Sequence, residues 1–436
     1  MRGRGHGSPR LAEWNRFVQP THRAWRTCLF VAFAFLGSAQ AVAPQTLSHR
    51  GFVEGRGYWY PETAPNDTRT EVADFLAREE IFVKPVPWFQ LAAGFDIRAN
   101  SYEQVDQSWD TLDWRDRGAL RPAISLRRLS GNLRHGPLTV DVGKQFIRWG
   151  KTDIVTPTDY LAPRDFLNVV GGDELLGVTG ARVVIASSAY SLDAAWVPFF
   201  TPSRTPLLTQ RWTAVPPSAA DFTLVDRGSE LPRRAQGGIR LAHTGRGLEY
   251  SVSYFHGFSN VPAVDIRPGS EPVQLEVVKT YPALRSYGVD LAVATRWLTI
   301  KGEATYSTSP DATADEFAIY VIQLERQVGE WLFLGGYVGE VVHIRRTPFV
   351  FAPDRGLTRT AVARASYTID ANRSLALEVA ARGTGDGVYG RGEYSQAIGA
   401  HWRATAAGVI VRGRDGDFLG QYRRNSHASV ALRYSF

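Results

Sequence analysis

From about residue 47 to the carboxyl terminus, the chain repeats segments of about 10 to 12 residues in which apolar side chains alternate with polar or small ones. In one such segment, Leu375, Leu377 and Val379 alternate with Ser374 and Glu378. A period of two is that of a β-strand, whose successive side chains point to opposite faces. Each segment therefore predicts a strand with one apolar face and one polar face.

Strand length and loop length separate a membrane barrel from a soluble sandwich, which also alternates. Strands in soluble sheets average about five or six residues, whereas a tilted strand that crosses a bilayer needs about 9 to 11. Short turns alternate along the chain with longer connections, the largest near 150–179, 201–235 and 259–285. Short turns at one end and long loops at the other are typical of bacterial outer-membrane barrels.

The last ten residues place Val430, Leu432, Tyr434 and the terminal Phe436 on one face. This pattern resembles the carboxyl-terminal strand by which bacterial outer-membrane barrels are recognised for assembly. We therefore expect an all-β fold, a transmembrane antiparallel up-and-down β-barrel in the outer membrane. Its expected partners are membrane lipid and, through Phe436, the assembly machinery; formation of a homo-oligomer stays open.

Regular alternation of short and long connections gives 18 strands with both termini in the periplasm, and 16 strands is the alternative. The segment 272–281 is strand-like, but counting it as spanning would break the even number, so we assign it to an outer loop. The predicted strands are 50–60, 71–84, 88–100, 119–130, 137–148, 180–188, 190–200, 236–244, 247–258, 286–296, 298–308, 316–328, 331–344, 358–369, 373–384, 391–402, 405–414 and 427–436.

The first 43 residues differ from the rest of the chain. An arginine-rich start, an apolar run over 28–36 and small residues up to Ala43 predict a secretory signal peptide. The apolar run is about half the length that a spanning helix needs. Residues 44–436 are then a single barrel, and the only cysteine, Cys28, leaves with the signal peptide, so the mature protein has no thiol.

Charge gives no support for a nucleic-acid partner. The formal net charge of the whole chain is +7. Most of this excess lies in the signal peptide, because residues 44–436 carry 44 basic and 42 acidic groups. A nearly neutral body does not create the basic field that attracts polyanions.

The most distinctive motif lies between Gly143 and Asp165. It contains Gly143-Lys-Gln145, Trp149-Gly150 and Pro157-Thr-Asp159. The stretch resembles the G-[KR]-Q…WG…P-D segment of a group of porin-like outer-membrane proteins of undefined substrate, similar in style to alginate-export barrels. The matching residues cover under a tenth of the chain. The resemblance implies a pore or an exporter and no particular solute.

A barrel of 16 to 18 strands is wide enough for an aqueous channel. The loop 150–179 follows a strand and contains prolines and glycines, so it can fold back into the lumen. We expect it to form the constriction of a porin-like channel for diffusion or export of hydrophilic solutes. The residues predicted to line the pore or the constriction are Lys144, Arg148, Lys151, Asp153, Asp159, Arg164, Asp165, Arg240, Arg296, Glu303 and Arg364.

Two alternatives stay open. The loop charges can pair with one another and brace the loop, and the barrel can be a structural or adhesive protein with a plugged lumen. If Lys144, Arg148 and Lys151 face the constriction, they favour a mild preference for anions. The sequence has no G-x-S-x-G nucleophile context and no metal-ligand spacing, so we expect no enzyme activity, metal or cofactor.

Overall fold

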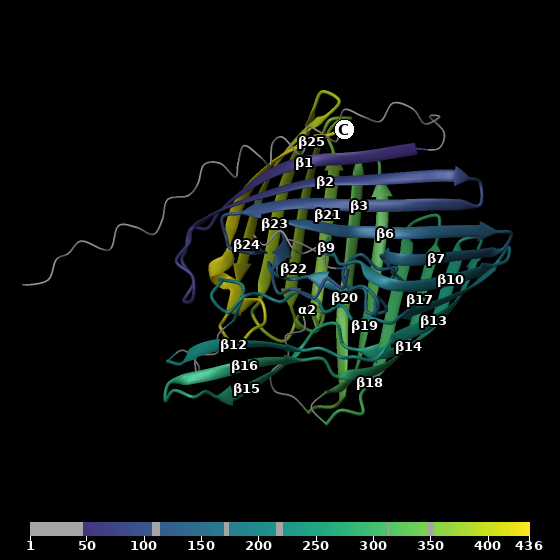
Figure 1. Cartoon of the computed structure of the whole chain (residues 1–436). Coiled ribbons are helices and arrows are strands. Elements are labelled where there is room, and N and C mark those ends of the chain that lie inside the picture. Colours follow the sequence, from purple (N-terminus) through teal and green to yellow (C-terminus); the bar gives the residue numbers. More distant parts are fainter. Residues whose placement is uncertain (1–46, 107–113, 170–173, 215–220, 313, 347–352) are drawn as a thin grey trace, which may run out of the picture. The chain divides into compact units, whose positions relative to one another are not determined.

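The computed structural model describes residues 47–106, 114–169, 174–214, 221–312, 314–346 and 353–436. The predicted signal peptide, with Cys28, lies outside the described residues. Residues Ser48–Phe436 form one compact unit. In it, eighteen strands form a single antiparallel sheet that closes on itself as a barrel (Figure 1).

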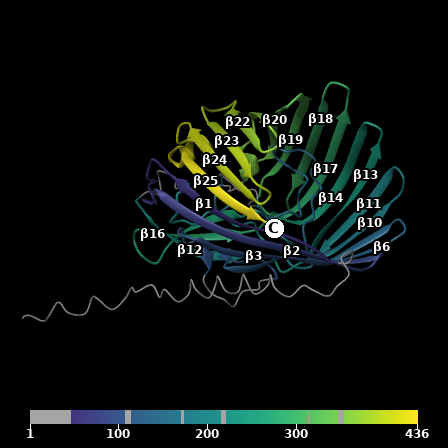
Figure 2. The ribbon, with the colours of Figure 1, turned by 90° about the horizontal axis from the view of Figure 1, so that it is seen from above.

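Neighbours in the barrel are neighbours in the chain, as in an up-and-down barrel. Figures 1 and 2 place β2 and β3 across the barrel from β19 and β20. The barrel strands are β1 (Leu47–Trp59), β2 (Glu71–Val86), β3 (Phe89–Asn100), β6 (Ile124–His135), β7 (Leu138–Gln145), β10 (Val178–Ala186), β11 (Tyr190–Val197), β13 (Gln236–Gly245), β14 (Leu248–Phe258), β17 (Ala283–Ala294), β18 (Thr299–Thr308), β19 (Glu316–Val328), β20 (Trp331–Ile344), β21 (Thr360–Thr368), β22 (Arg373–Arg382), β23 (Val388–Ile398), β24 (Trp402–Arg412) and β25 (His427–Ser435).

The barrel closes where the last strand pairs with the first. β25 and β1 are antiparallel, in a register that runs from Phe52 opposite Ser435 to Trp59 opposite Ala428. Terminal Phe436 adds two backbone hydrogen bonds with Gly51, each of 3.0 Å. The seam leaves no barrel strand with an open edge, which is what a sheet in lipid requires.

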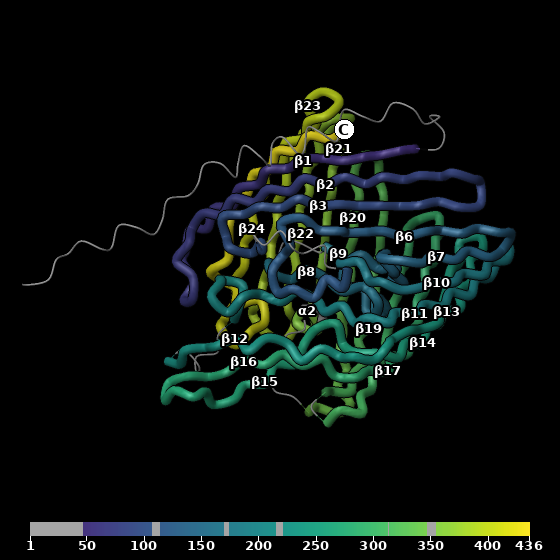
Figure 3. Tube along the Cα trace, in the orientation of Figure 1, coloured from purple at the N-terminus to yellow at the C-terminus, as the bar shows by residue number. Residues whose placement is uncertain are grey.

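The predicted number of 18 strands is confirmed, and so is the exclusion of 272–281 from the barrel wall. That segment forms β16 (Gln274–Thr280), which pairs with β12 (Thr223–Glu230) and β15 (Ala263–Pro268) in a separate three-stranded sheet built from two long loops. The tube in Figure 3 shows this sheet at the end of the barrel where the long loops lie.

Four predicted strands were placed wrongly along the chain. The expected strand 119–130 is β6, which begins at Ile124. The expected strands 286–296, 391–402 and 405–414 are β17, β23 and β24, and each begins three residues earlier than expected. The turn before β7 is made at Gly136, whose positive φ of 53° suits a tight turn, and not at Gly131. Gly131 lies inside β6 beside the ring of Phe89, where the ring fills the space that a side chain would take.

The two faces of the wall differ as predicted. Large apolar side chains such as Val430 and Leu377 are more than half exposed on the outer face. Tryptophans form two outward belts, with Trp59 and Trp196 towards the loops and Trp88, Trp297, Trp331 and Trp402 towards the turns. Tyr58 lies on the inner face, against Tyr60 and His427, because strand alternation points it away from the face of its neighbour Trp59.

Short elements occupy the long loops. No helix in the described ranges is long and apolar enough to cross a membrane. The short elements are β4 (Val105–Asp106), β5 (Arg121–Pro122), β8 (Arg164–Asp165), β9 (Glu174–Leu175), α2 (Pro353–Gly356) and the 3₁₀ turn η2 (Gly420–Asn425).

The facing of β22 can be tested with two adjacent substitutions. Leu377→Arg puts a cation on the lipid face and should destabilise the barrel by about 2–4 kcal/mol if the residue lies near the bilayer midplane. Glu378→Ala changes the inner face and should cost under about 1 kcal/mol. Urea unfolding in lipid vesicles measures both, and equal losses would contradict the assigned facing.

Candidate functional site

The interior of the barrel holds the connection between β7 and β10, residues 146–177, of which the structure describes 146–169 and 174–177. This interior loop begins at the predicted motif. Gly143 has a φ of +124°, and a Cβ at this position would lie 2.2 Å from the carbonyl oxygen of Leu129, so only glycine fits. Two residues later, the side-chain amide of Gln145 donates to the carbonyl of Gly180 on the neighbouring strand at 3.2 Å.

The Trp149, Gly150 and Asp159 positions of the motif close a compact turn. The Asp159 carboxylate accepts hydrogen bonds from the backbone N–H groups of Trp149 and Gly150, both at 2.7 Å. It also accepts one from the guanidinium of Arg148 at 3.1 Å. The indole N–H of Trp149 donates to Asp193 on β11 at 3.0 Å. The residues that carry the sequence resemblance therefore shape the start of the loop and attach it to the inner wall.

Glu303 on β18 is the strongest anchor of the interior loop. One carboxylate oxygen accepts from the backbone N–H groups of Lys151 and Thr152 and from the Thr152 hydroxyl, at 2.9, 3.1 and 3.0 Å. The other oxygen accepts from the backbone N–H and the hydroxyl of Thr158, both at 2.8 Å. Glu303 is 3% exposed, so this buried carboxylate is satisfied by the loop itself.

Further contacts carry the loop along the inner wall. Lys151 pairs with Glu249 on β14 at 2.6 Å and with Asp290 on β17 at 3.6 Å. Asp153 pairs with Lys301 on β18 at 2.7 Å and accepts from the Gln323 amide on β19 at 2.6 Å. Burial acts to raise the pKa of Asp153, but the hydrogen bonds from Lys301 and Gln323 outweigh it and lower that pKa.

On β20, a side chain at Gly336 would collide with Ile154, because the Cβ would lie 2.5 Å from its Cδ1 atom. Residues 149–158 therefore contact inward-facing groups on strands from β11 to β20. The loop lies against this half of the inner wall.

A buried ion network holds the far part of the loop. Asp165 in β8 pairs with Arg121 at 2.8 Å and with Arg204 at 3.3 Å. Arg204 also pairs with Asp116, which in turn pairs with Lys144 at 3.4 Å. Burial acts to raise the pKa of Asp165, but the two guanidinium groups lower it well below its usual range. These ion pairs join three separate connections at the loop end of the barrel, those between β3 and β6, β7 and β10, and β11 and β13, to strand β7.

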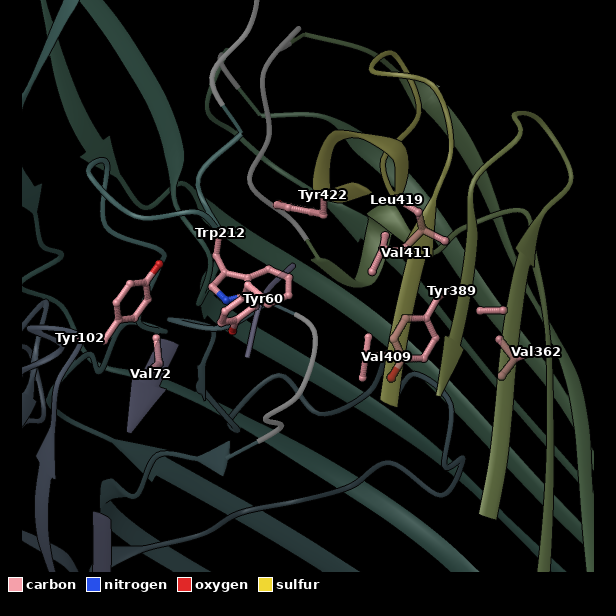
Figure 4. Packing of buried hydrophobic residues seen from close by; sticks show 11 residues of the cluster. Tyr60, Val72, Tyr102, Trp212, Val362, Tyr389, Val409, Val411, Leu419 and Tyr422 are labelled. Carbon is pink, nitrogen blue, oxygen red and sulfur yellow. The ribbon is translucent and has the colours of Figure 1, made fainter. Parts of the chain in front are cut away.

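The segment 198–214 runs from β11 to the first and last strands. Its Gln210 side chain donates to the carbonyl of Tyr102, and its Arg211 guanidinium lies 3.8 Å from the ring centre of Tyr60. Trp212 packs in an apolar cluster with Tyr60 and Tyr422 (Figure 4). The rim is thus tied together by aromatic packing as well as by ion pairs.

The opposite part of the inner wall, on β21–β25, is not covered by the interior loop's hydrogen bonds. It carries Arg364, Arg391, Arg403 and Arg433, and Glu378 lies opposite Arg364 and Arg391 in the strand register. Towards the loop end, its inward residues are apolar and buried: Val362, Tyr389, Val409 and Val411. Arg403 and Arg433 are directly opposite each other on β24 and β25. In the chain as described, no carboxylate pairs with Arg364 or Arg403, whereas Arg433 pairs with Glu54 at 2.7 Å.

The predicted site residues fall into three groups. Lys144, Asp159, Arg164 and Asp165 are buried, and each pairs with another charged side chain. Arg148, Lys151, Asp153, Arg240 and Glu303 lie where the loop meets the wall, and Arg240 pairs with Asp290 at 3.1 Å. Arg364 faces the open lumen, while Arg296 lies beyond the end of β17, in a turn, against the ring of Trp297.

Two lumen-facing arginines escaped the sequence analysis. Arg403 was expected in a turn, and Arg391 was expected at the very start of a strand. The turn instead occupies 399–401, between β23 and β24. The signal that could have found it is Gly399, one residue past a regular alternation that ends at Ile398.

Within the described residues, no group of three or more histidine, cysteine, aspartate or glutamate side chains could hold a metal ion. The geometry instead presents a water-accessible wall of arginines facing a loop that is held by hydrogen bonds.

Several solved bacterial outer-membrane proteins have a similar architecture. Acinetobacter baumannii OccAB4 has a TM-score of 0.53 at 10% identity, over 90% of this chain and 100% of that chain. A BenF-like porin from Pseudomonas fluorescens Pf-5 has a TM-score of 0.53 at 9% identity, over 90% and 97%. Pseudomonas aeruginosa OpdQ has a TM-score of 0.51 at 8% identity, over 90% and 98%.

The fold is that of an outer-membrane porin. At these identities the likeness establishes the fold alone, and no family model and no curated protein matches the sequence. The predicted fold class is confirmed, and the apolar outer wall of this porin fold belongs in the outer membrane.

Removing the Glu303 anchor should release the interior loop. Glu303→Ala leaves the backbone donors of Lys151, Thr152 and Thr158 without their acceptor and should cost about 3 kcal/mol of stability. Trypsin should then cleave after Lys151 in the folded barrel. Glu249→Ala is the matched control, because Glu249 is half exposed and, among the described residues, its carboxylate forms an ion pair with Lys151 alone, so it should cost under about 1 kcal/mol. Equal resistance of both variants to trypsin would contradict this anchoring.

Proposed function

We propose that this protein is a passive outer-membrane channel for small or extended hydrophilic solutes. The interior loop, 146–177, which includes most of the predicted constriction loop 150–179, bounds the narrowest part on one side. The arginine-bearing wall of β21–β25 bounds it on the other. Solutes then move down their own gradient, so the same path serves diffusion inward and export.

The observation that carries this proposal is the set of hydrogen bonds between residues 149–158 and the wall from β11 to β19. A loop fixed on one side of a wide barrel reduces the lumen without filling it. The remaining path then runs along the part of β21–β25 outside the apolar cluster of Trp212 and Tyr422, where Arg364 and Arg403 are exposed to water. Nothing in this arrangement calls for bond-making chemistry, and we propose no enzyme activity.

The charge of this path supports a preference for anions. Lys144, Lys151 and Arg148 were expected to supply it, but each of them pairs with a carboxylate, which reduces its contribution. Arg364 and Arg403 pair with none among the residues described and are the better candidates. Low-dielectric walls weaken the screening of such charges and increase their effect on passing ions.

Planar-bilayer recordings test both the channel and its selectivity. The purified wild-type barrel should conduct ions, and its reversal potential in a KCl gradient should show a preference for anions over cations. Arg364→Glu combined with Arg403→Glu should move the reversal potential towards cations. The control Arg246→Glu, in an exposed turn outside the lumen, should leave it unchanged.

Two results would count against the proposal. A wild-type barrel that stays silent across salts would favour a structural or adhesive protein with a plugged lumen. If both proteins conduct and the double variant has the reversal potential of wild type, the protein is a channel, but Arg364 and Arg403 do not line the ion path.

A further inference from the structure

A shallow groove lies on the outer face of the wall, over β18–β22. Its volume is about 360 Å³, and its outward lining includes Leu298, Leu324, Phe333, Gly335, Ala363 and Leu377. Gly335 and Ala363 form the bottom of the groove because their side chains are absent or small. The larger side chains of Leu324, Phe333 and Leu377 form its sides. In a membrane, such a groove has the shape and the polarity to hold an acyl chain.

Two arginines lie at the turn end of this groove. Arg326 lines it and projects outward, because it alternates with the exposed Leu324 and Val328 on β19. Arg296 lies in the adjacent turn, 4.7 Å from the ring centre of Trp297. In the part of the chain that the structure describes, neither guanidinium has a hydrogen bond or an ion pair. An outward cation beside an apolar groove is costly in a membrane unless an anion neutralises it.

The level of these arginines in the membrane is set by their neighbours. Arg326 is directly opposite Phe333, which is the next outward-facing residue after Trp331 along β20. Trp331 and Trp297 are exposed on the outer face and belong to the aromatic belt at the turn end. Aromatic belts lie at the headgroup level of a bilayer. Arg326 therefore lies where lipid phosphates are found.

We propose that the groove is a binding site for an anionic glycerophospholipid, with an acyl chain in the groove and the phosphate on Arg326 and Arg296. The planar fork of a guanidinium matches phosphate oxygens with two hydrogen bonds. Charge complementarity selects this occupant over a zwitterionic lipid. It also selects it over a second copy of the chain, which would bring the same unpaired arginines to the contact.

Native mass spectrometry of the purified full barrel tests whether the arginines of the site bind the lipid phosphate. Wild type should retain phosphatidylglycerol more strongly than phosphatidylcholine. Arg326→Ala should lower retention of phosphatidylglycerol by about fivefold and leave that of phosphatidylcholine unchanged. Arg246→Ala removes an exposed arginine from another short turn and should change neither.

A second variant tests the groove itself. A side chain at Gly335 would enter open space, so Gly335→Leu should fold and fill the groove. Heat-modifiable mobility on a gel checks folding, and retention of the phosphatidylglycerol should fall. Unchanged retention in Arg326→Ala or in Gly335→Leu would overturn the site. Dimers that disappear with Gly335→Leu would assign the groove to a second copy and overturn it as well.

Discussion

A backbone in lipid must satisfy its own hydrogen bonds, and closure of the sheet between β1 and β25 is how this chain does so. Everything else follows from that closure. Alternation along each strand sends apolar side chains to the membrane and polar ones inward. Because successive strands are antiparallel, the short turns lie at one end and the long loops at the other, so the loops start from a common rim, and the even number of strands brings both barrel termini to the turn end.

A barrel of eighteen strands is too wide for wall side chains to fill. Buried carboxylates on the wall therefore need partners from elsewhere, and the interior loop supplies them. Glu303 shows the exchange most clearly, since five donors of the loop converge on its two oxygens. The loop gains a fixed position, and the wall gains satisfied charges. On β21–β25, Trp212 and Tyr422 pack against the wall towards the loop end. Arg364 and Arg403 lie outside that cluster and stay open to water.

Much of this architecture could be predicted from the sequence because the signals are local. The two-residue period gave the strands, and the terminal Phe436 and the loop lengths gave the membrane barrel. Strand bounds were less secure, as β6 and β24 demonstrate, because a glycine such as Gly131 can serve packing as well as a turn. The motif around Gly143 lies where the interior loop begins.

The contacts of the candidate site depend on residues far apart in the chain. Nothing in the sequence near Glu303 indicates that Lys151, Thr152 and Thr158 bind it, since the pairing needs a folded barrel. The same holds for the unpaired arginines. Arg403 faces the lumen because β24 begins at Trp402, three residues before the start that the sequence pattern predicts.

The attachment of the interior loop to the inner wall can be tested on the native sequence with a zero-length carbodiimide cross-linker and peptide mass spectrometry. The chain has only five lysines, so few links compete. We expect amide links between Asp153 and Lys301, 2.7 Å apart, and between Glu249 and Lys151, 2.6 Å apart. Lys279 and Asp226, 2.8 Å apart in the outer sheet, are the positive control. If the control pair is linked and neither interior pair is, the interior loop does not lie against the inner wall.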